Sequence, residues 1–356
     1  MRAVRFHSPR NLRFERVPRP RAPRGREVKV RVEAAGICGT DLHVYETGAY
    51  VTAAPVTMGH EFSGTVIETG EEVRSLTAGD RVVGDSRVSC GKCEFCAKGF
   101  PNLCVSLGFI GEVREGAFAE EILLEERSLV RIGSSVPFET AALAEPLAVS
   151  IHAFRQAFAD SPGAAGARGA AGEPTRAAPG GATRTRGVLV LGAGPIGALL
   201  FGVARINGFE DITVVDVSRY RRAAMEKTHP GSTADPSSIP ARRYDVVFET
   251  TGSIAVAESL LPKVMKKKGT LVMVGLFGSP PSFDLNGLIE NEWNVRGCAA
   301  FSDELGEAAR LLDAHWPAFA HAVSHLLPLR EFQSAFDLLL SPEKEAMKVV
   351  FRPGLV

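Results

Sequence analysis

Two short segments near the amino terminus carry side chains of the types that bind zinc. The first, residues 36–43, contains Cys38, and the second, about twenty residues later, contains His60 and Glu61. Thiolate, imidazole and carboxylate are all zinc ligands, and a catalytic site uses three of them and leaves one position open. Taken alone, a buried thiol and a satisfied core histidine are the commoner explanations of Cys38 and His60. A zinc site formed by these two segments therefore needs further evidence from the rest of the sequence.

A denser group of cysteines lies further along. Cys90, Cys93 and Cys96 follow one another at intervals of three, and Cys104 comes after seven more residues. In a chain expected inside the cell, this density favours a closed tetrahedral thiolate site over disulfides, with an iron–sulfur cluster or unligated thiols as alternatives. Four ligands leave no open position, so the lobe at residues 90–104 is predicted to hold a structural zinc.

A glycine-rich turn between an apolar strand and a helix predicts a dinucleotide site. The strand is Val188–Leu191, and Asp216 closes the next expected strand. Such glycines let backbone N–H groups and the helix dipole approach a pyrophosphate, whereas a turn needed only for packing is the alternative. An acid such as Asp216 can bind both ribose hydroxyls, which favours NAD, although nearby arginines would soften the preference and admit NADP. The predicted cofactor-binding residues are Gly192, Gly194, Pro195, Ile196, Gly197, Asp216 and Arg221.

The composition is that of a globular protein without a strong net electrostatic field. The chain has 356 residues, of which 45% are hydrophobic and 23% charged, and this excludes disorder or a coiled coil as its main state. Its 41 Lys and Arg residues balance 41 Asp and Glu residues, so nucleic acid and anionic membranes are not expected partners. The first residues lack the apolar segment of a secretory signal, and no stretch is expected to span a membrane. A cytoplasmic location is predicted.

The pattern of elements changes along the chain. Residues 1–158 begin with short strands separated by Gly and Pro turns, which predict an antiparallel, barrel-like half, and end in helical spacing. Residues 159–187 are rich in Ala, Gly and Pro and predict a linker or loop without chemistry. From 188 to 298, strands alternate with helices, one of them expected from Ile254 to about Lys267, and this predicts a parallel doubly wound sheet. Residues 299–356 are expected to return to the first domain.

Together these features resemble the zinc-containing medium-chain alcohol dehydrogenases, over nearly the whole chain. The resemblance rests on the segment from Cys38 to His43, the triplet 59–61, the four-cysteine lobe, Glu145-Pro146 and the glycine turn. It implies an α/β fold with a GroES-like β-barrel catalytic domain and a Rossmann cofactor domain, and it implies two zinc ions per chain. One departure is that residues 225–244 are shorter than usual, which predicts a trimmed crossover in the sheet.

The resemblance also implies the ligands of the catalytic zinc. Cys38 and His60 match two of them, Glu61 or Glu145 matches the third, and water is the fourth. The pair of glutamates, in place of a second cysteine, resembles the polyol and threonine dehydrogenase branch and differs from the ethanol-type enzymes.

Three neighbouring side chains match supporting roles in the same family. Asp41 matches the acid that orients the zinc-bound imidazole, a role that zinc sites generally require. Thr40 and His43 match a proton relay that runs from the substrate hydroxyl through the nicotinamide ribose to solvent.

The predicted activity is hydride transfer between a hydrophilic secondary alcohol and NAD. The resemblance implies a polyol, sugar or aminocyclitol as substrate and a homodimer or homotetramer as the assembly. Three alternatives stay open: a threonine-type amino-alcohol dehydrogenase, a zinc-free reductase of the same superfamily, and a non-catalytic binding protein on this fold.

Overall fold

The computed structural model describes residues 1–159, 186–341, 343 and 345–355, and the chain divides into two compact units. The first unit is Met1–Pro146 with Ser302–Val356, and the second is Leu147–Phe301. The predicted boundaries at residues 158 and 298 therefore differ from the observed ones. The reason is the helix α4 (Ala144–Ala157), whose Phe154 ring packs 5.6 Å from the ring of Phe209 in the second unit. The predicted linker at 159–187 lies outside the described residues, apart from 159, 186 and 187.

The first unit is built mainly from antiparallel strands. In its larger sheet the described strands run in the order β10-β6-β5-β3-β18-β17, with β9 also paired to β3, and β1, β2 and β4 form a smaller sheet. Only the β17–β18 pair among these described strands is parallel. The strands are β1 (Arg2–Ser8), β2 (Asn11–Arg16), β3 (Glu27–Gly36), β4 (Val56–Thr57), β5 (Glu61–Thr69), β6 (Arg81–Gly84), β7 (Arg87–Val88), β8 (Gly108–Phe109), β9 (Glu121–Glu125), β10 (Leu129–Arg131), β17 (Val323–Leu327) and β18 (Lys348–Phe351).

The long strand β3 explains how this sheet forms a core. Val28, Val30 and Val32 alternate with charged residues and are buried, so one face of the strand packs inward. The carboxyl-terminal strand β18 pairs with the end of β3, with Val350 opposite Gly36, and so lies beside the start of the next helix. The helices of this unit are α1 (Gly39–Thr47), α2 (Glu94–Ala97), α3 (Phe138–Ala141), α9 (Leu305–His315) and α10 (Phe332–Leu340).

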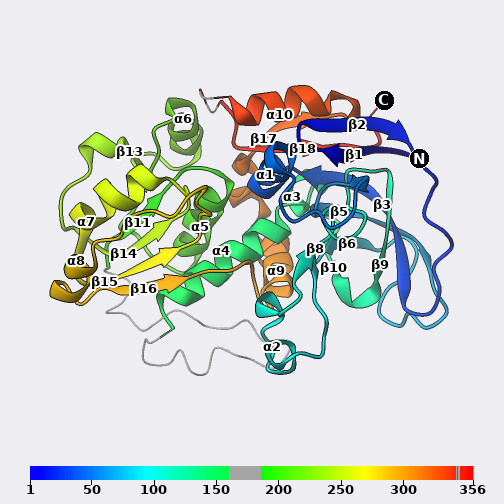
Figure 1. The fold of residues 1–356 in the computed structure, drawn as a ribbon, viewed down its shortest axis with the longest axis horizontal. Coiled ribbons are helices and arrows are strands. Elements are labelled where there is room, and N and C mark those ends of the chain that lie inside the picture. Colours follow the sequence, from blue (N-terminus) through cyan, green and yellow to red (C-terminus); the bar gives the residue numbers. More distant parts are fainter. Residues whose placement is uncertain (160–185, 342, 344, 356) are drawn as a thin grey trace. The chain divides into compact units, whose positions relative to one another are not determined.

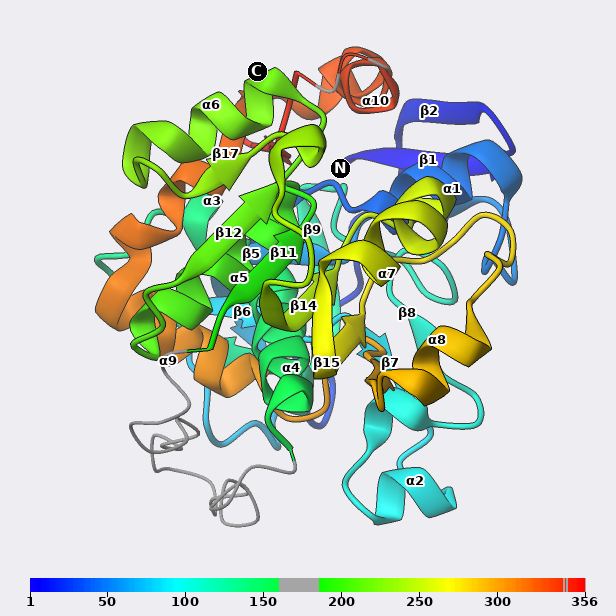
Figure 2. The same cartoon turned by 90° about the vertical axis from the view of Figure 1, so that its left-hand side faces the viewer.

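The second unit contains a parallel sheet, visible in Figures 1 and 2, whose described strands run in the order β13-β12-β11-β14-β15-β16. The chain starts at β11 and extends the sheet in both directions, which makes it doubly wound. The strands are β11 (Val188–Leu191), β12 (Ile212–Val215), β13 (Thr233–Ala234), β14 (Tyr244–Glu249), β15 (Met265–Met273) and β16 (Asn294–Gly297). Besides α4, its helices are α5 (Pro195–Ile206), α6 (Arg219–Thr228), α7 (Leu261–Val264) and α8 (Leu285–Glu290).

Two connections in this sheet test the predictions. The trimmed crossover is confirmed: β13 has two residues, and a single 3-10 turn, Pro236–Ser238, is the helical element before β14. The helix expected to reach Lys267 is wrong at its end, because α7 stops at Val264 and β15 begins at Met265. Met265 pairs with Tyr244 of β14 and is buried, so sheet pairing overrides the helical spacing of this segment.

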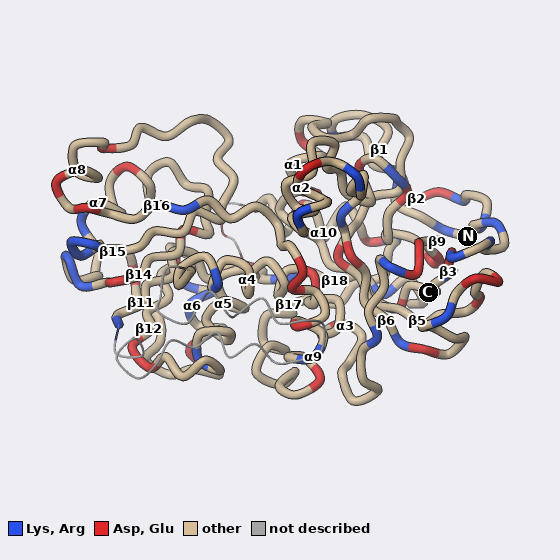
Figure 3. The backbone as a smooth tube through the Cα atoms, turned by 90° about the horizontal axis from the view of Figure 1, so that it is seen from below, with Lys and Arg blue, Asp and Glu red and all other residues tan. Residues whose placement is uncertain are grey.

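Positions of Lys and Arg and positions of Asp and Glu are both scattered along the backbone of each unit (Figure 3). Among the described residues, none of the helices combines the length and the apolar character that a membrane crossing requires.

Candidate functional site

The structure brings together Cys38, His60 and Glu61. Cys38 caps the start of α1 just after β3, whereas His60 precedes β5 and Glu61 is the first residue of that strand. Because β3 and β5 are antiparallel neighbours with Gly36 opposite Glu61, the two motifs lie side by side. One ligand atom from each of the three residues lies within 4.8 Å of the others.

Asp41 connects two members of this cluster. Its Oδ2 accepts a hydrogen bond of 2.8 Å from the backbone N–H of Cys38, and its Oδ1 lies 3.7 Å from Nδ1 of His60. Burial raises the pKa of Asp41, and the positive charge of His60 opposes that effect. Burial alone would lower the pKa of His60, but Asp41 and Cys38 outweigh it and raise the pKa well above its usual range. The imidazole is therefore held in surroundings that favour positive charge.

Glu61 forms a buried ion pair with Lys348, which the sequence analysis did not identify. The Nζ atom donates to both carboxylate oxygens, at 2.7 and 2.6 Å, and to the carbonyl of Ile37 at 2.9 Å. The side chains of Lys348 and Glu61 are 3% and 1% exposed. Burial would lower the pKa of Lys348, but Glu61 and Cys38 raise it above its usual value, so the lysine stays charged. Lys348 is 287 residues from Glu61 in the sequence and reaches it because β18 pairs with β3. No rule based on sequence spacing could have identified this pair.

Glu145 lies in the first turn of α4 and has a different partner. Its Oε1 accepts a hydrogen bond of 2.7 Å from the Ser86 hydroxyl. Burial, with a contribution from Glu61, raises the pKa of Glu145 to about 7, while His60 acts in the opposite direction. Among the described residues, the compact cluster of ligand atoms includes Glu61 and does not include Glu145. The two candidate third ligands thus occupy distinct electrostatic settings.

The residues matched to a proton relay lie on α1. Thr40 Oγ1 is 3.7 Å from Cys38 Sγ, and the exposed ring of His43 lies 5.9 Å from the ring of Tyr50. No hydrogen bond joins Thr40 to His43 in the described part of the chain, so a relay through both requires a third group between them. The nicotinamide ribose was the predicted third group.

The donor set of this cluster fits a zinc ion. A thiol, an imidazole and a carboxylate converge within 4.8 Å, and these are the ligand types of catalytic zinc sites. Asp41 and the Cys38 thiol already hold His60 in surroundings that favour positive charge, so a divalent cation would find a favourable potential here.

The four-cysteine lobe also fits zinc. The Sγ atoms of Cys90, Cys93, Cys96 and Cys104 lie within 4.8 Å of one another, and all four cysteines are free. Backbone N–H groups of Cys93 and Cys90 donate to Sγ of Cys90 and Cys104, both at 3.3 Å. Hydrogen bonds from backbone N–H groups lower the pKa of Cys104 to about 6, whereas desolvation and neighbouring thiols raise that of Cys96 to about 11. A metal cation bound by the four sulfur atoms would replace their protons and would favour the thiolate form of all four cysteines.

The glycine turn joins β11 to α5. A Cβ on Gly197 would lie 1.8 Å from the carbonyl oxygen of Gly192, so only glycine allows the helix to pack this closely against the turn. Gly192 has φ of 105°, a conformation that favours glycine. Gly194 caps α5, and Pro195 and Ile196 form its first turn. The geometry is that of a helix amino terminus suited to a pyrophosphate.

Asp216 follows β12 and is connected to the same turn. Its carboxylate accepts hydrogen bonds from the backbone N–H of Ala193 at 2.8 Å and of Ser218 at 2.7 Å. Oδ2 also lies 3.9 Å from Nη1 of Arg221. Burial lowers the pKa of Arg221, and Asp216 opposes that effect. The structure therefore brings the predicted acid, arginine and glycine turn together.

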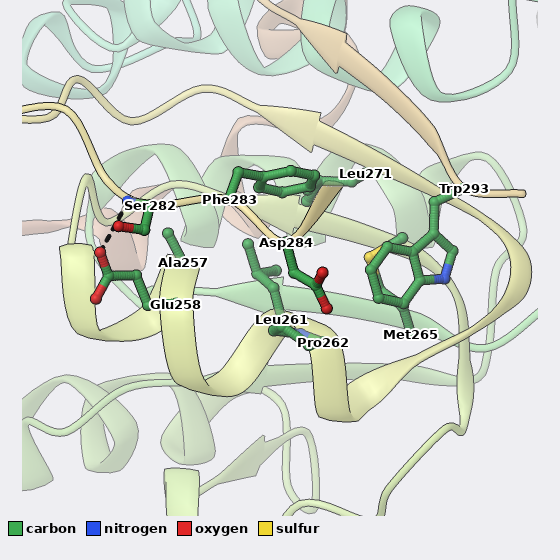
Figure 4. Close-up of a pocket in the computed structure, with 10 residues that line it drawn as sticks. All are labelled: Ala257, Glu258, Leu261, Pro262, Met265, Leu271, Ser282, Phe283, Asp284 and Trp293. Atoms are coloured by element: carbon green, nitrogen blue, oxygen red, sulfur yellow. Dashed lines mark hydrogen bonds between the residues drawn. The ribbon is translucent and has the colours of Figure 1, made fainter. Parts of the chain in front are cut away.

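A separate hollow lies at the side of the second unit. Figure 4 shows it between α7 and the segment around Phe283, with Leu261, Met265 and Trp293 among its apolar lining. Glu258 accepts a hydrogen bond of 2.8 Å from the backbone N–H of Ser282 at its edge. None of the predicted zinc ligands or cofactor-binding residues lines it, so it is distinct from both sites.

Comparison with known proteins decides the family. Residues 24–134 match the alcohol dehydrogenase GroES-like domain, and residues 195–314 match the zinc-binding dehydrogenase family. A sorbitol dehydrogenase from Halalkalibacterium halodurans is 30% identical over 98% of this chain and 97% of that protein. The chain belongs to the zinc-containing medium-chain alcohol dehydrogenase family. The predicted family, the GroES-like plus Rossmann fold class and the zinc- and NAD(P)-dependent enzyme class are confirmed.

This zinc dehydrogenase is also similar to two further proteins. An L-threonine 3-dehydrogenase from Coxiella burnetii is 27% identical over 93% of both chains. A crystal structure of a Sinorhizobium meliloti protein bound to NADP is 27% identical, covers 99% of both chains and superposes with a TM-score of 0.82.

Proposed function

We propose that this dehydrogenase transfers hydride between a hydrophilic secondary alcohol, namely a polyol, a sugar or an aminocyclitol, and NAD. The observation that carries the proposal is the presence of two buried glutamates, Glu61 and Glu145, beside Cys38 and His60. Zinc with one thiolate and one carboxylate is formally neutral, and the second carboxylate adds negative charge beside the open position. Such a site suits hydroxyl groups that donate hydrogen bonds, and it also attracts an ammonium group. The sorbitol dehydrogenase relative supports a polyol.

In this proposal Cys38 and His60, with Glu61 or Glu145 as the third ligand, hold the catalytic zinc. When bound there, zinc would supply Lewis acidity and the nicotinamide would supply the partner for hydride transfer. Asp41 orients the His60 ring in this proposal, because the backbone N–H of Cys38 fixes its Oδ2 at 2.8 Å and its Oδ1 lies 3.7 Å from Nδ1 of His60.

Thr40 and His43 are proposed to move the proton of the substrate hydroxyl. Thr40 lies beside the Cys38 thiol, where it can accept that proton, and His43 is exposed, where it can release a proton to solvent.

The cofactor is proposed to be NAD, with NADP as a weaker substitute. Each Asp216 oxygen accepts one backbone hydrogen bond and keeps capacity for a ribose hydroxyl, while its charge repels a 2′-phosphate. The NADP-bound relative and the nearby Arg221 are the reasons to keep NADP as a candidate.

A homodimer or homotetramer is the proposed assembly, and the cytoplasm the proposed location. The edge strand β16 and the adjacent α8 expose apolar side chains, Val295 at 40%, Leu285 at 64% and Ile289 at 71%, which a second copy would cover. A lobe of four thiols suits the reducing cell interior. Sedimentation analysis of the purified protein tests the assembly, and a monomer at micromolar concentration would contradict it.

The test of the proposed activity is a comparison of kcat/KM for ethanol, hexanol, a linear polyol, threonine and an aminocyclitol with NAD. We expect the polyol or the aminocyclitol to be the best substrate. If ethanol or hexanol were preferred by tenfold or more, about 1.4 kcal/mol of transition-state stabilisation, the assignment would be wrong. Threonine as the best substrate would favour the second candidate, an amino-alcohol dehydrogenase, which the Coxiella relative supports.

A further inference from the structure

Glu112 is a buried carboxyl group for which the described residues provide no hydrogen-bonding partner. Glu112 is 4% exposed. Among the described residues, no N–H or O–H group donates a hydrogen bond to its carboxylate, and no cation forms an ion pair with it. Burial of a carboxylate without a hydrogen-bond donor is unfavourable because its charge loses hydration, and the attraction of His60 offsets only part of that loss. Groups of this kind concentrate at functional sites.

The turn that carries Glu112 lies against the zinc-ligand segment. The backbone N–H of Glu112 donates to the carbonyl of Phe109 at 3.2 Å, and the Phe109 ring lies 6.3 Å from the ring of His60. Gly111 packs so tightly that a Cβ there would come within 2.8 Å of the backbone nitrogen of Gly59. Glu112 is therefore fixed close to His60 by backbone packing.

Glu112 also adjoins the loop beyond α1. Its carbonyl accepts a hydrogen bond of 3.5 Å from the backbone N–H of Thr52. Two residues earlier, Tyr50 has φ of 70°, is 54% exposed and has its ring 5.9 Å from that of His43. A non-glycine residue in this conformation is strained, and such strain is common in loops that contact a ligand. Glu112 thus lies between the ligand His60 and the loop beside the exposed relay histidine.

Acidic groups outnumber cationic groups around Glu112. Burial raises the pKa of Glu112 to about 7, and His60 and Asp41 also act on it, so its carboxyl lies within electrostatic reach of both. Within the described residues it is not a member of the compact cluster of ligand atoms, so it is not placed as a zinc ligand. The acids around the site are Asp41, Glu61, Glu112 and Glu145, with the Cys38 thiol, and the buried groups that carry positive charge beside them are Lys348 and His60.

We propose that Glu112 is a specificity-determining residue that binds a cationic amine on the substrate, next to the hydroxyl that reacts. The proposal rests on the proposed function and narrows its substrate class to amino alcohols with further hydroxyl groups, such as aminocyclitols. A neutral hydroxyl could donate one hydrogen bond but would leave the charge of Glu112 uncompensated. An ammonium group donates and also cancels that charge, which makes a short, charge-assisted bond in a site with excess acid.

The test compares two substrates that differ at one group. Zinc-loaded wild type, Glu112→Gln and the control Glu46→Gln are assayed with an aminocyclitol and with the cyclitol that has a hydroxyl in place of the amine. Glu46 is exposed on α1, so its substitution removes one charge from the same unit without touching the turn at residues 109–114.

We expect the wild type to prefer the amine and Glu112→Gln to lower kcat/KM for the amine by about ten- to a hundredfold, the usual effect of losing a hydrogen bond to a charged group. The value for the cyclitol should change by less than about threefold, and Glu46→Gln should leave both substrates unchanged. Equal losses for both substrates, or a wild type that prefers the cyclitol, would overturn the proposal.

Thermal unfolding of the same zinc-loaded proteins separates substrate binding from a structural role. If Glu112 exists to bind substrate, Glu112→Gln removes a buried carboxyl group that has no hydrogen-bond donor among the described residues and should keep or raise Tm. A fall in Tm of more than about 3 °C would show that Glu112 supports the His60 segment and would overturn the proposal.

A wild type that oxidises ethanol or hexanol best would overturn the proposed function and this inference with it. A wild type that turns over cyclitols and aminocyclitols, with an unchanged kcat/KM for the amine in Glu112→Gln, would overturn this inference alone.

Discussion

Replacing Lys348 by methionine is expected to leave the Glu61 carboxylate buried without its cation. Lys348 Nζ contacts both oxygens of Glu61 at 2.6 and 2.7 Å, and the two side chains are 3% and 1% exposed. Methionine keeps most of the aliphatic volume, so the change removes the charge and its hydrogen bonds and disturbs packing little. Lys348→Arg is the matched control, because it keeps the charge.

The expected loss of stability follows from this geometry. Two unit charges about 3 Å apart at an effective dielectric constant near 20 attract by about 5–6 kcal/mol. Part of that attraction offsets the cost of desolvating the lysine, and removal of one partner from a buried pair typically costs about 3–5 kcal/mol. We therefore expect the free energy of unfolding of Lys348→Met to fall by about 3–5 kcal/mol, whereas Lys348→Arg should lose much less.

The assay is urea denaturation followed by circular dichroism, in the wild-type background and in Cys38→Ser, with zinc content measured for each protein. If Glu61 is the third ligand, catalytic zinc supplies the missing positive charge, and the cost of Lys348→Met should be smaller with zinc bound than in Cys38→Ser. If Glu145 is the third ligand, the cost should be similar in both backgrounds. The experiment thus distinguishes the two candidate ligands.

The double variant Lys348→Met with Glu61→Gln tests the physical reason. Because it removes both charges, it should recover most of the lost stability in the Cys38→Ser background. A double variant no more stable than Lys348→Met would refute the reasoning, since the loss would then come from the packing of the lysine chain and not from an unpaired carboxylate.

Three further predictions concern the remaining parts of the protein. Cys93→Ser should lose the structural zinc and fold poorly, whereas Cys38→Ser should fold and bind NADH with one zinc per chain but without turnover; elemental analysis and NADH fluorescence check both, and wild-type rates from Cys38→Ser would contradict its assignment. Asp216→Ala should raise kcat/KM with NADP relative to NAD, and a wild type that already prefers NADP would show that Asp216 does not select NAD. Hydrogen bonds from the Ser75 side chain and backbone lower the pKa of Glu126 to about 2 from 4.5, so its stabilising effect is complete above pH 4.5 and is lost toward pH 2. Calorimetry of Glu126→Gln should show a lower Tm at pH 7 and a shallower acid-side decline, and an unchanged profile would exclude this role.

The sequence was sufficient wherever the chemistry is local. The four cysteines lie within a short lobe, and the glycine turn joins a strand to the helix that follows it, so their spacing alone predicts which atoms meet. The alternation of strands and helices after residue 188 predicts the parallel sheet for the same reason, since each element adjoins the next along the chain. The trimmed crossover also followed from the length of residues 225–244.

Tertiary structure decided whatever depends on distant pairing. Lys348 reaches Glu61 because β18 pairs with β3, and Met265 enters a strand because Tyr244 lies beside it, although its own neighbours are spaced as on a helix. The burial of Glu112 comes from the packing of its turn on residues 58–59, which no local pattern encodes. Sequence spacing determines contacts within an element or a turn, whereas the charge balance of a buried site depends on side chains that only the folded sheet brings together.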